Sequence, residues 1–197
     1  MKPKERIRLA ARKCFAAKGY AGTTIADIEQ AAGYKPGSGG LYRHYDSKTT
    51  ILEAVIDAEI ASNNAAIVDV ATPPADADPV EVLEQVVRRG LAQLDRQSDL
   101  MRILFADLDR FPELLAKVRT EVTETTYRDF SNRLSSAHAI GLIPKLDFDA
   151  TTILALGSVV DFKIKQHVLG FTPLDVDEDR LVKSWVHIFA KLFEVAR

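Results

Sequence analysis

Four hydrogen-bond donors lie close together between residues 42 and 48, and their types suit contacts with phosphates and bases. Tyr42 and His44 offer neutral donors of a length that fits phosphate oxygens, and Arg43 can pair bidentately with a guanine. Lys48 adds a positive charge where a helix is expected to begin, and helix N-termini favour phosphate. This combination predicts a surface that contacts the backbone of a nucleic acid and at least one base edge.

A glycine-rich turn precedes these donors, with the sequence Tyr34-Lys35-Pro36-Gly37-Ser38-Gly39-Gly40. Gly39 and Gly40 carry no side chain, which lets the backbone approach a groove closely. Lys35 and Ser38 lie in the same turn and are also candidates for base contacts. We expect the helix after the turn to begin near Ser38, which would be its N-cap.

Helices on either side must hold the turn and the donors in place. The apolar pattern predicts a first helix over residues 4–18, and a second that begins at the N-cap Thr24 with Asp27 three residues later. Leu41 and Tyr45 can anchor the third helix against these two. A capped helix, a turn and a short exposed helix in this order form the helix-turn-helix arrangement, which presents its second helix to the major groove of DNA.

Charge is distributed unevenly along the chain. Residues 1–50, which we call the head, contain ten Lys and Arg and four Asp and Glu, a net charge of +6. The remaining residues contain 16 and 24, a net charge of −8. A basic head on an acidic body fits a head that binds a polyanion. Ordinary solvated charge would give the same count, so the asymmetry alone does not establish an interface.

The chain is predicted to be all-α, because apolar residues recur at helical spacing and strand-like alternation is nearly absent. Its 197 residues and apolar content of 47% are enough for packed globular units. The proline-rich residues 72–79 indicate a loop between helices. Further helices are expected from Ser47 as an N-cap onward, and over residues 79–96, 98–109, 112–138, 147–169 and 177–196.

Other chemistry finds little support in the residue pattern. The glycine-rich turn lacks the strand and the Gly-Lys-Ser/Thr of a phosphate-binding loop, and Ser38 lacks the glycine two residues earlier that a nucleophile elbow needs. The four histidines never fall at i, i+4 spacing and Cys14 is the single cysteine, so we expect no metal, no cofactor and no catalytic residues. One cysteine, no N-terminal signal sequence and no long apolar run lead us to expect a cytoplasmic protein without membrane spans.

The run from Arg6 to about Ile56 resembles the N-terminal domain of the tetracycline-repressor (TetR) family of bacterial regulators. The landmarks are RIRLAARKCFAAKGYAGTTIADIEQAAG and then LYRHYDSK before an apolar helix, in the family's order and spacing. The resemblance implies a helix-turn-helix DNA-binding domain at residues 1–48 and a helical ligand-binding and dimerisation domain at residues 49–197. It also implies that Thr24 contacts the DNA backbone and that the DNA face is lined by Gly39, Gly40, Tyr42, His44 and Lys48.

The glycine-rich turn is longer than the family usually has between the second helix and the Leu-Tyr pair. The added residues lengthen the turn, so the sequence does not assign which residue between Lys35 and Gly40 reaches a base edge. Tyr42, His44 and Lys48 keep their spacing relative to one another, and their implied roles therefore transfer better.

Aromatic and sulfur-containing side chains after the head could line a cavity for a ligand. At helical spacing, such residues more often belong to an ordinary core. The family resemblance favours a pocket between helices for an apolar or aromatic small-molecule effector, with candidate lining residues Met101, Phe105, Tyr127, Phe130, Phe162 and Trp185.

The last two expected helices carry apolar stripes suited to association between two copies of the chain. One stripe contains Ile153 and Leu154 beside the small Gly157, and the other contains Trp185 and Phe189. Two such helices from each subunit would form a four-helix interface, as in the family. Alternatively, the stripes close the core of a single subunit.

These observations predict a homodimeric transcription regulator that binds a pseudo-palindromic operator in double-stranded DNA. We expect a repressor that a small-molecule effector releases from the operator by favouring a different conformation. The alternative is a helical module that binds a ligand or a protein without binding an operator. A small helical enzyme is the third possibility, but the sequence offers no nucleophile–base pair or metal cluster for one.

Overall fold

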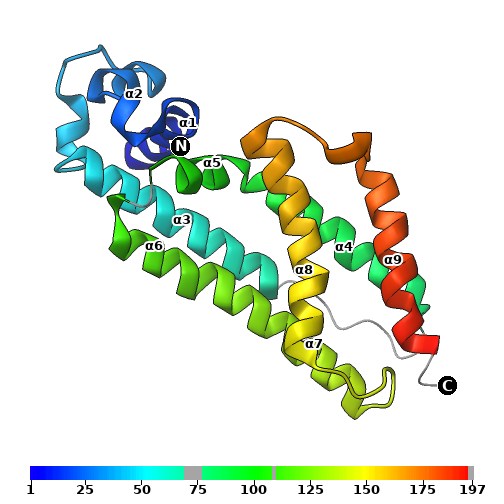
Figure 1. Cartoon of the computed structure of the whole chain (residues 1–197). Helices are drawn as coiled ribbons and strands as arrows, with labels where there is room; N and C mark the ends of the chain where they lie inside the picture. The colour runs from blue at the N-terminus through cyan, green and yellow to red at the C-terminus, as the bar shows by residue number, and fades with distance from the viewer. Residues whose placement is uncertain (69–76, 108–109, 195–197) are drawn as a thin grey trace. The chain divides into compact units, whose positions relative to one another are not determined.

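The structure, a computed structural model, describes residues 1–68, 77–107 and 110–194. Every regular element within these ranges is a helix, which confirms the predicted all-α fold (Figure 1). The predicted loop at residues 72–79 falls mostly outside the described residues. The chain divides into two compact units, Met1–Asn64 with Gln97–Val122 and Ala65–Arg96 with Thr123–Arg197.

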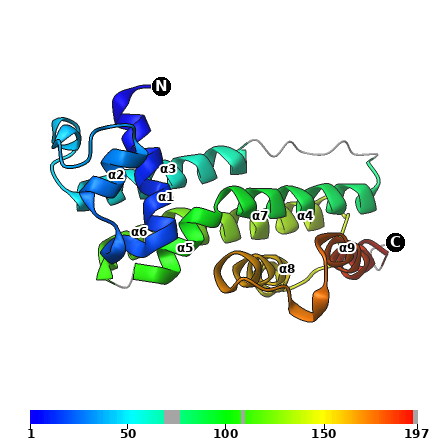
Figure 2. The same ribbon diagram turned by 90° about the horizontal axis from the view of Figure 1, so that it is seen from above.

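The first unit contains the head and a later pair of helices. Its elements are α1 (Pro3–Gly22), α2 (Ile25–Ala31), the 3-10 helix η1 (Gly40–Arg43), most of α3 (Lys48–Val68), α5 (Ser98–Asp107) and α6 (Pro112–Val118). Helix α1 packs against both α2 and α5, and Figure 2 shows α2 beside α1. The segment Gln97–Val122, which contains α5 and α6, therefore completes a unit whose first part is Met1–Asn64.

The core of the first unit follows directly from the helical periodicity of α1. Ile7, Ala11 and Phe15 recur every four residues, lie on one face of the helix and are fully buried. Leu41 and Tyr45 are buried in the same core, which confirms their predicted role as anchors of the segment after the turn. Further members from α2, α3 and α5 include Ile28, Ile51, Leu52, Val55, Ile56, Leu100 and Ile103.

The first helix is interrupted at Gly19, which has φ +70° and ψ 169°, and resumes as a short turn to Gly22. The positive φ requires glycine. At the interruption, the backbone N–H of Tyr20 donates to Oδ2 of Asp107 at 2.6 Å. A Cβ at position 19 would lie 2.5 Å from the same oxygen. Gly19 therefore supplies both the backbone conformation and the space that let the carboxylate from α5 bind the end of α1.

The second unit contains α4 (Pro79–Arg96), α7 (Thr125–Ala139), α8 (Phe148–Ile164) and α9 (Glu178–Glu194). A π-helical turn, Lys165–Leu169, and a 3-10 turn, Pro173–Asp175, follow α8. Another π-helical stretch, Arg119–Glu124, joins α6 to α7 along the chain. The predicted helices over residues 79–96, 112–138 and 147–169 are thus confirmed to within a few residues, with π-helical stretches inside two of them. The predicted helix over residues 177–196 is confirmed as far as Glu194, and its last two positions lie outside the described residues.

The core of the second unit is formed by α4, α8 and α9, with Phe130 of α7 packed against it. The indole N–H of Trp185 in α9 donates to the backbone carbonyl of Ala155 in α8 at 3.0 Å. This bond satisfies the single polar atom of the buried ring. The buried core residues are Val87, Leu91, Ala155, Val159, Phe162, Val182, Trp185 and Val186.

A lysine ammonium group is also buried in the second unit. Lys163 in α8 is 1% exposed, and its Nζ lies 2.6 Å from Oδ1 of Asp95 and 2.7 Å from Oε2 of Glu178. It also donates to Oε1 of Gln166 at 3.2 Å. These partners supply acceptors for all three N–H donors of the ammonium, which is how a buried charge is stabilised.

Candidate nucleic-acid interface

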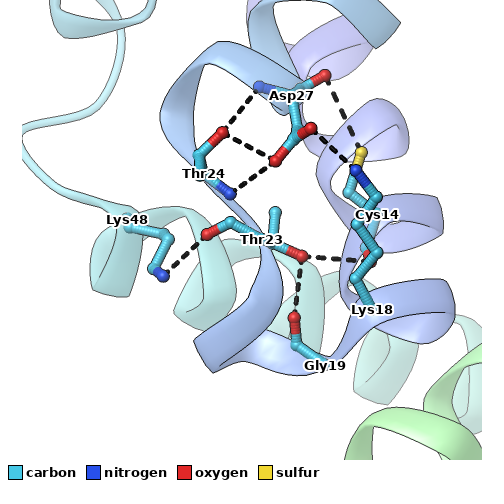
Figure 3. A network of polar contacts seen from close by, with 7 residues as sticks. All are labelled: Cys14, Lys18, Gly19, Thr23, Thr24, Asp27 and Lys48. Atoms are coloured by element: carbon cyan, nitrogen blue, oxygen red, sulfur yellow. Dashed lines mark hydrogen bonds and ion pairs between the residues drawn. The ribbon is translucent and has the colours of Figure 1, made fainter.

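The second helix is fixed at its start by a capping box. The backbone N–H of Asp27 donates to Oγ1 of Thr24 at 3.1 Å, and the backbone N–H of Thr24 donates to Oδ2 of Asp27 at 2.8 Å (Figure 3). Both local bonds follow the pattern predicted from the sequence. Lys18 in α1 pairs with the other oxygen of Asp27 at 2.7 Å. Hydrogen bonds from Lys18 and from Thr24 hold the pKa of Asp27 far below its ordinary value.

The Thr24 hydroxyl is also engaged in this cap. It donates its proton to Oδ2 of Asp27 at 2.6 Å and accepts the Asp27 N–H. Thr24 nevertheless lies at the exposed surface, at the N-terminus of α2. Its predicted contact with a DNA backbone remains a prediction.

Lys48 also forms contacts within the protein, which its position in the sequence did not indicate. Its ammonium donates to the backbone carbonyls of Tyr20 at 2.7 Å and of Thr23 at 2.8 Å, and lies 4.1 Å from the centroid of the Tyr20 ring. Lys48 thus ties the first turn of α3 to the connection between α1 and α2 (Figure 3). An ammonium has three N–H donors, so at most one remains for a phosphate once two carbonyls are bound.

Thr23 is a positioning residue that the sequence analysis missed. It is 1% exposed, and its hydroxyl lies 2.7 Å from the carbonyl oxygen of Gly19 and 3.1 Å from that of Cys14 (Figure 3). The hydroxyl thereby satisfies carbonyls near the end of α1, and the backbone carbonyl of Thr23 accepts from Lys48. In the sequence, the only indication was a threonine directly before the capping threonine, and this does not show which way the side chain points.

The segment that carries the predicted DNA contacts is a 3-10 helix and not an α-helix. It begins at Gly40, and its N-cap is Gly39, with φ +68°. The prediction that Ser38 is the N-cap of this helix is therefore wrong, because Gly39 occupies that position. Gly39, with its positive φ, sets the chain direction at the helix start, and only residues 40–44 follow before Tyr45 returns to the core. That distance is too short for a second α-helical turn.

The exposed side of this short helix carries the donors. Tyr42 is 56% exposed and Arg43 is exposed, while Leu41 between Gly40 and Tyr42 is buried. His44 is half-buried at the C-terminal end. Tyr42 and Arg43 therefore face the solvent, while the buried Leu41 anchors the same short helix in the core.

The turn before the helix contributes further exposed groups. Lys35 and Ser38 are exposed, and Gly39 and Gly40 are half-buried. All nine predicted DNA-contacting residues lie in the first unit, between Thr24 and Lys48. The sequence analysis did not single out Glu29, which is fully buried in α2 and accepts hydrogen bonds from this turn.

The predicted effector-pocket residues lie in both units. Met101 and Phe105 belong to α5 in the first unit, where Met101 is buried and Phe105 is 60% exposed. The other four, in the second unit, are Tyr127, Phe130, Phe162 and Trp185. Of these, Phe162 and Trp185 are buried in the core, Phe130 packs against it, and burial raises the pKa of Tyr127. Their role as a pocket remains a prediction.

A shallow groove of about 360 Å³ lies between α4 and α9 of the second unit, and none of the six predicted pocket residues lines it. It is lined by apolar and charged residues together: Val80, Glu84, Val182, Lys183, Val186, His187, Ala190 and Lys191. Within the described part of the chain, no helix is long and apolar enough to cross a membrane. Among the same residues, no three His, Cys, Asp or Glu side chains are placed to hold a metal ion.

A helix-turn-helix head followed by a helical second unit defines the class of helical DNA-binding regulators. Residues 7–55 match the family described as bacterial regulatory proteins, tetR family. Residues 81–195 match the family described as AefR-like transcriptional repressor, C-terminal domain. The chain belongs to the TetR family of bacterial regulatory proteins, as its sequence predicted. It is accordingly a DNA-binding transcriptional regulator, and members of the family are in general transcription factors and not enzymes.

Solved structures share the fold over nearly the whole chain. A tetR-family regulatory protein from Rhodococcus RHA1 is 23% identical with a TM-score of 0.70, covering 98% of this chain and 97% of that chain. The flavonoid-responsive regulator FrrA is 24% identical with a TM-score of 0.67, covering 98% and 96%. The fatty acid degradation regulator FadR from Bacillus halodurans is 18% identical with a TM-score of 0.68, covering 95% and 94%. At these identities the likeness shows the fold alone. No curated protein matches the chain significantly.

Proposed function

We propose that this protein is a homodimeric repressor that binds an operator through η1 and the turn before it, and that a small molecule releases it. The observation that carries the proposal is the presentation of Tyr42 and Arg43. Both are exposed on a short helix whose Leu41 is buried, within a head of net charge +6. Exposed donors on a rigid support are what groove recognition requires.

The donors divide into two roles. Tyr42 and His44 are proposed to contact phosphates, which position the head without reading sequence. Arg43 is proposed to read a guanine, because its forked guanidinium matches the two acceptors on the major-groove edge of that base. Lys35 and Ser38 lie exposed on the neighbouring turn and would extend the contact. Lys48 contributes its positive charge and at most one donor.

Dimerisation is proposed through α8 and α9 of the second unit. Ile153 and Leu154 of α8 are 60% and 70% exposed, and Ile188 of α9 is 62% exposed. Gly157 of α8 has open space around its Cα, so a second helix could approach closely there. Large apolar side chains left exposed on two helices favour a self-complementary interface in a two-fold dimer. Two heads would then read the two halves of a pseudo-palindromic operator.

The effector is proposed to be an apolar or aromatic small molecule bound in the second unit, near Tyr127, Phe130, Phe162 and Trp185. The names of two structures with the same fold mention a flavonoid and a fatty acid. Both compound classes are largely apolar, which agrees with this lining. Release follows if the effector binds a conformation in which the two heads no longer fit the operator. Because its target is chromosomal DNA, we place the protein in the cytoplasm.

Selection of binding sites from a random duplex library, followed by anisotropy titration, tests the DNA-binding part. We expect one selected sequence with two-fold symmetry and a salt-sensitive affinity. Tyr42→Ala and His44→Ala should weaken binding to all duplexes by about tenfold, as loss of a charge-assisted contact does. Arg43→Ala should instead relax the preference at one base position of each half-site. If the protein bound selected and scrambled duplexes with equal affinity, the alternative of a ligand-binding module without an operator would hold instead.

The dimer is tested separately. Ile153→Lys together with Ile188→Lys should give a monomer in sedimentation analysis, because each places a charge in the proposed apolar interface. The monomer should bind a single half-site weakly and lose the affinity gained from two linked heads. Glu81→Lys with Asp175→Lys, at two exposed positions of the same unit, is the control and should remain dimeric. A monomeric wild-type protein would contradict the proposed interface.

A further inference from the structure

Glu29 is an acidic residue buried inside the basic head. It lies in α2, is 0% exposed, and faces the glycine-rich turn and not the solvent. Its Oε2 accepts the backbone N–H of Gly37 at 2.6 Å, and its Oε1 accepts the hydroxyl of Ser38 at 3.3 Å. Its backbone carbonyl accepts the N–H of Tyr34 at 2.8 Å. Three bonds from one residue thus reach three positions of the turn.

Ser38 extends this contact to the helix that follows. A hydroxyl has one donor and two acceptor sites. The Ser38 hydroxyl donates to Glu29 and accepts the backbone N–H of Gly40 at 3.4 Å. Gly40 is the first residue of η1. The carboxylate of Glu29 is therefore connected through one side chain to the start of the helix that presents Tyr42 and Arg43.

The turn itself needs such support. Gly33, Gly37 and Gly39 have φ values of +75°, +73° and +68°, and glycine moves easily between this conformation and others. A turn with two such glycines, and a third directly before it, has a large conformational entropy unless outside contacts select one conformation. Hydrogen bonds to Gly37 and Ser38 constrain the middle of the turn, between the first and last of these glycines.

An aromatic contact supports the far end of the turn. A Cβ at Gly40 would lie 3.0 Å from Cδ1 of Tyr34, so the Tyr34 ring packs closely on the Gly40 backbone. The guanidinium of Arg6 in α1 lies 4.9 Å from the centroid of the same ring. Within the turn, the backbone N–H of Ser38 donates to the Lys35 carbonyl at 3.1 Å. The carboxylate of Glu29 adds the contacts that join Gly37 and Ser38 to α2.

We propose that Glu29 is a positioning residue for operator recognition. It fixes the lengthened turn in one conformation, so that Arg43 meets a base edge while Tyr42 and His44 meet phosphates, and it does so without touching DNA. A carboxylate does not favour a polyanion by its charge, so its contribution comes through the hydrogen bonds to Gly37 and Ser38. The inference rests on the proposed function of η1 as the DNA-contacting element.

Positioning affects the two kinds of DNA contact differently. Attraction between a +6 head and phosphates tolerates small displacements, because it falls off gradually with distance. A bidentate contact with a base requires accurate placement of the guanidinium. Loss of the Glu29 contacts should therefore weaken binding to the selected operator more than binding to a scrambled duplex. A residue that only stabilises the fold would lower both together.

The experiment compares Glu29→Gln, Ser38→Ala and the double variant with a matched control, Glu5→Gln. Glu5 is exposed in α1 of the same head, so its replacement makes the same change in charge. Each full-length variant is titrated by anisotropy against the duplex that the wild type selects and against a scrambled duplex, at one salt concentration. We expect Glu29→Gln to lose about tenfold in affinity for the selected duplex, the effect of one hydrogen bond to a charged group. Affinity for the scrambled duplex should stay equal or rise slightly, as for Glu5→Gln.

Ser38→Ala keeps the experiment informative if Glu29→Gln folds poorly, because Ser38 is exposed. Ser38→Ala should lower the ratio of the affinity for the selected duplex to that for the scrambled duplex by about threefold. Its effect should be smaller when Glu29 is already replaced, because the two residues act through one contact. Hydrogen exchange of residues 34–40 in the DNA-free protein should accelerate in both single variants and not in Glu5→Gln.

The outcomes separate this inference from the proposed function. A wild-type protein that selects no sequence overturns both. A selective wild type together with an equally selective Glu29→Gln overturns only the role of Glu29. Equal losses on both duplexes with a lowered melting temperature also overturn it, because they indicate a purely structural residue. Unchanged exchange of residues 34–40 in Ser38→Ala contradicts the proposed connection to η1.

Discussion

Lys48 in the first unit and Lys163 in the second both hold an ammonium group against protein atoms, but their partners differ. Lys48 is half-buried and bonds to the neutral carbonyls of Tyr20 and Thr23. Lys163 is buried between the carboxylates of Asp95 and Glu178. Carbonyl partners orient an ammonium without cancelling its charge, whereas two carboxylates more than cancel it.

The difference relates to what each unit does. Lys48 can join parts of the head and still contribute to the positive field that attracts DNA. A half-buried ammonium can do this because water still solvates it. Lys163 is 1% exposed, so the cost of burying its charge must be offset by opposite charge nearby. We therefore expect that removing the carboxylates around Lys163 strongly lowers the stability of the second unit. Removing Lys48 itself should instead affect DNA binding.

The largest effect is expected when Lys163 loses both carboxylates. Asp95→Asn with Glu178→Gln leaves the ammonium buried without counter-charge, and should destabilise the second unit by about 3–5 kcal/mol. Trp185 is the single tryptophan and lies in the core of that unit, so its emission during urea unfolding reports the change. The control Glu81→Gln with Asp175→Asn removes the same two charges at exposed positions and should change stability little. Equal effects in the two double variants would remove the contrast between the lysines.

The connection between α1 and α5 gives the next largest effect. Gly19→Ala forces a side chain into a positive-φ conformation and places its Cβ 2.5 Å from the Asp107 carboxylate. We expect a loss of about 1–3 kcal/mol in unfolding free energy, measured by urea unfolding followed by circular dichroism. Gly22→Ala is the matched control, because its Cβ would meet only Lys18 Cβ at an ordinary 3.6 Å. Substitution there should be neutral or slightly stabilising. Similar losses at both positions would mean that Asp107 does not depend on Gly19.

A smaller change in stability is expected at Lys48, together with a change in DNA binding. Lys48→Met removes two hydrogen bonds to neutral carbonyls and leaves no charged group without a partner, so we expect a loss of about 1–2 kcal/mol. The charge of Lys48 is not cancelled by its partners, and the slope of log affinity against log salt should fall by about one. Lys163→Met should leave that slope unchanged. An unchanged slope in Lys48→Met would show that its charge does not act on DNA.

Local patterns in the sequence predicted the supports of the interface well. The Thr24–Asp27 capping box and the N-cap at Ser47, whose Oγ accepts the Thr50 N–H at 3.1 Å, both join residues three apart. Such bonds depend on helix geometry alone, which is why they can be read from spacing. The burial of Leu41 and Tyr45 followed from their apolar character beside exposed donors. The bounds of the long helices followed in the same way from periodicity and punctuation by proline and glycine.

Contacts between distant residues could not be predicted. Asp107 binds the N–H of Tyr20 across 87 positions, and Lys163 meets Asp95 across 68. Spacing carries no information about such pairs, because they depend on how helices pack. The predicted N-cap at Ser38 was wrong for a related reason. The positive φ of Gly39 starts the helix one residue later. The Ser38 hydroxyl accepts the Gly40 N–H and also donates to the buried carboxylate of Glu29, nine residues away in the sequence.

The smallest effect is a dependence on pH at Asp27. Its pKa is lowered in the folded protein by hydrogen bonds from Lys18 first and Thr24 second, so the folded state holds the proton less tightly than the unfolded state. The stabilisation is therefore present above the unfolded pKa of about 4 and is lost as pH falls below it. The melting temperature of Asp27→Asn should thus lie below that of the wild type at pH 7, with the gap narrowing toward pH 3. Asp46→Asn removes an exposed acid of the same head and is the control for the change in charge. If the difference in melting temperature between the two proteins stayed constant with pH, the cap would depend on geometry alone. The exposed ion pair of Asp27 would then contribute no charge-dependent stability.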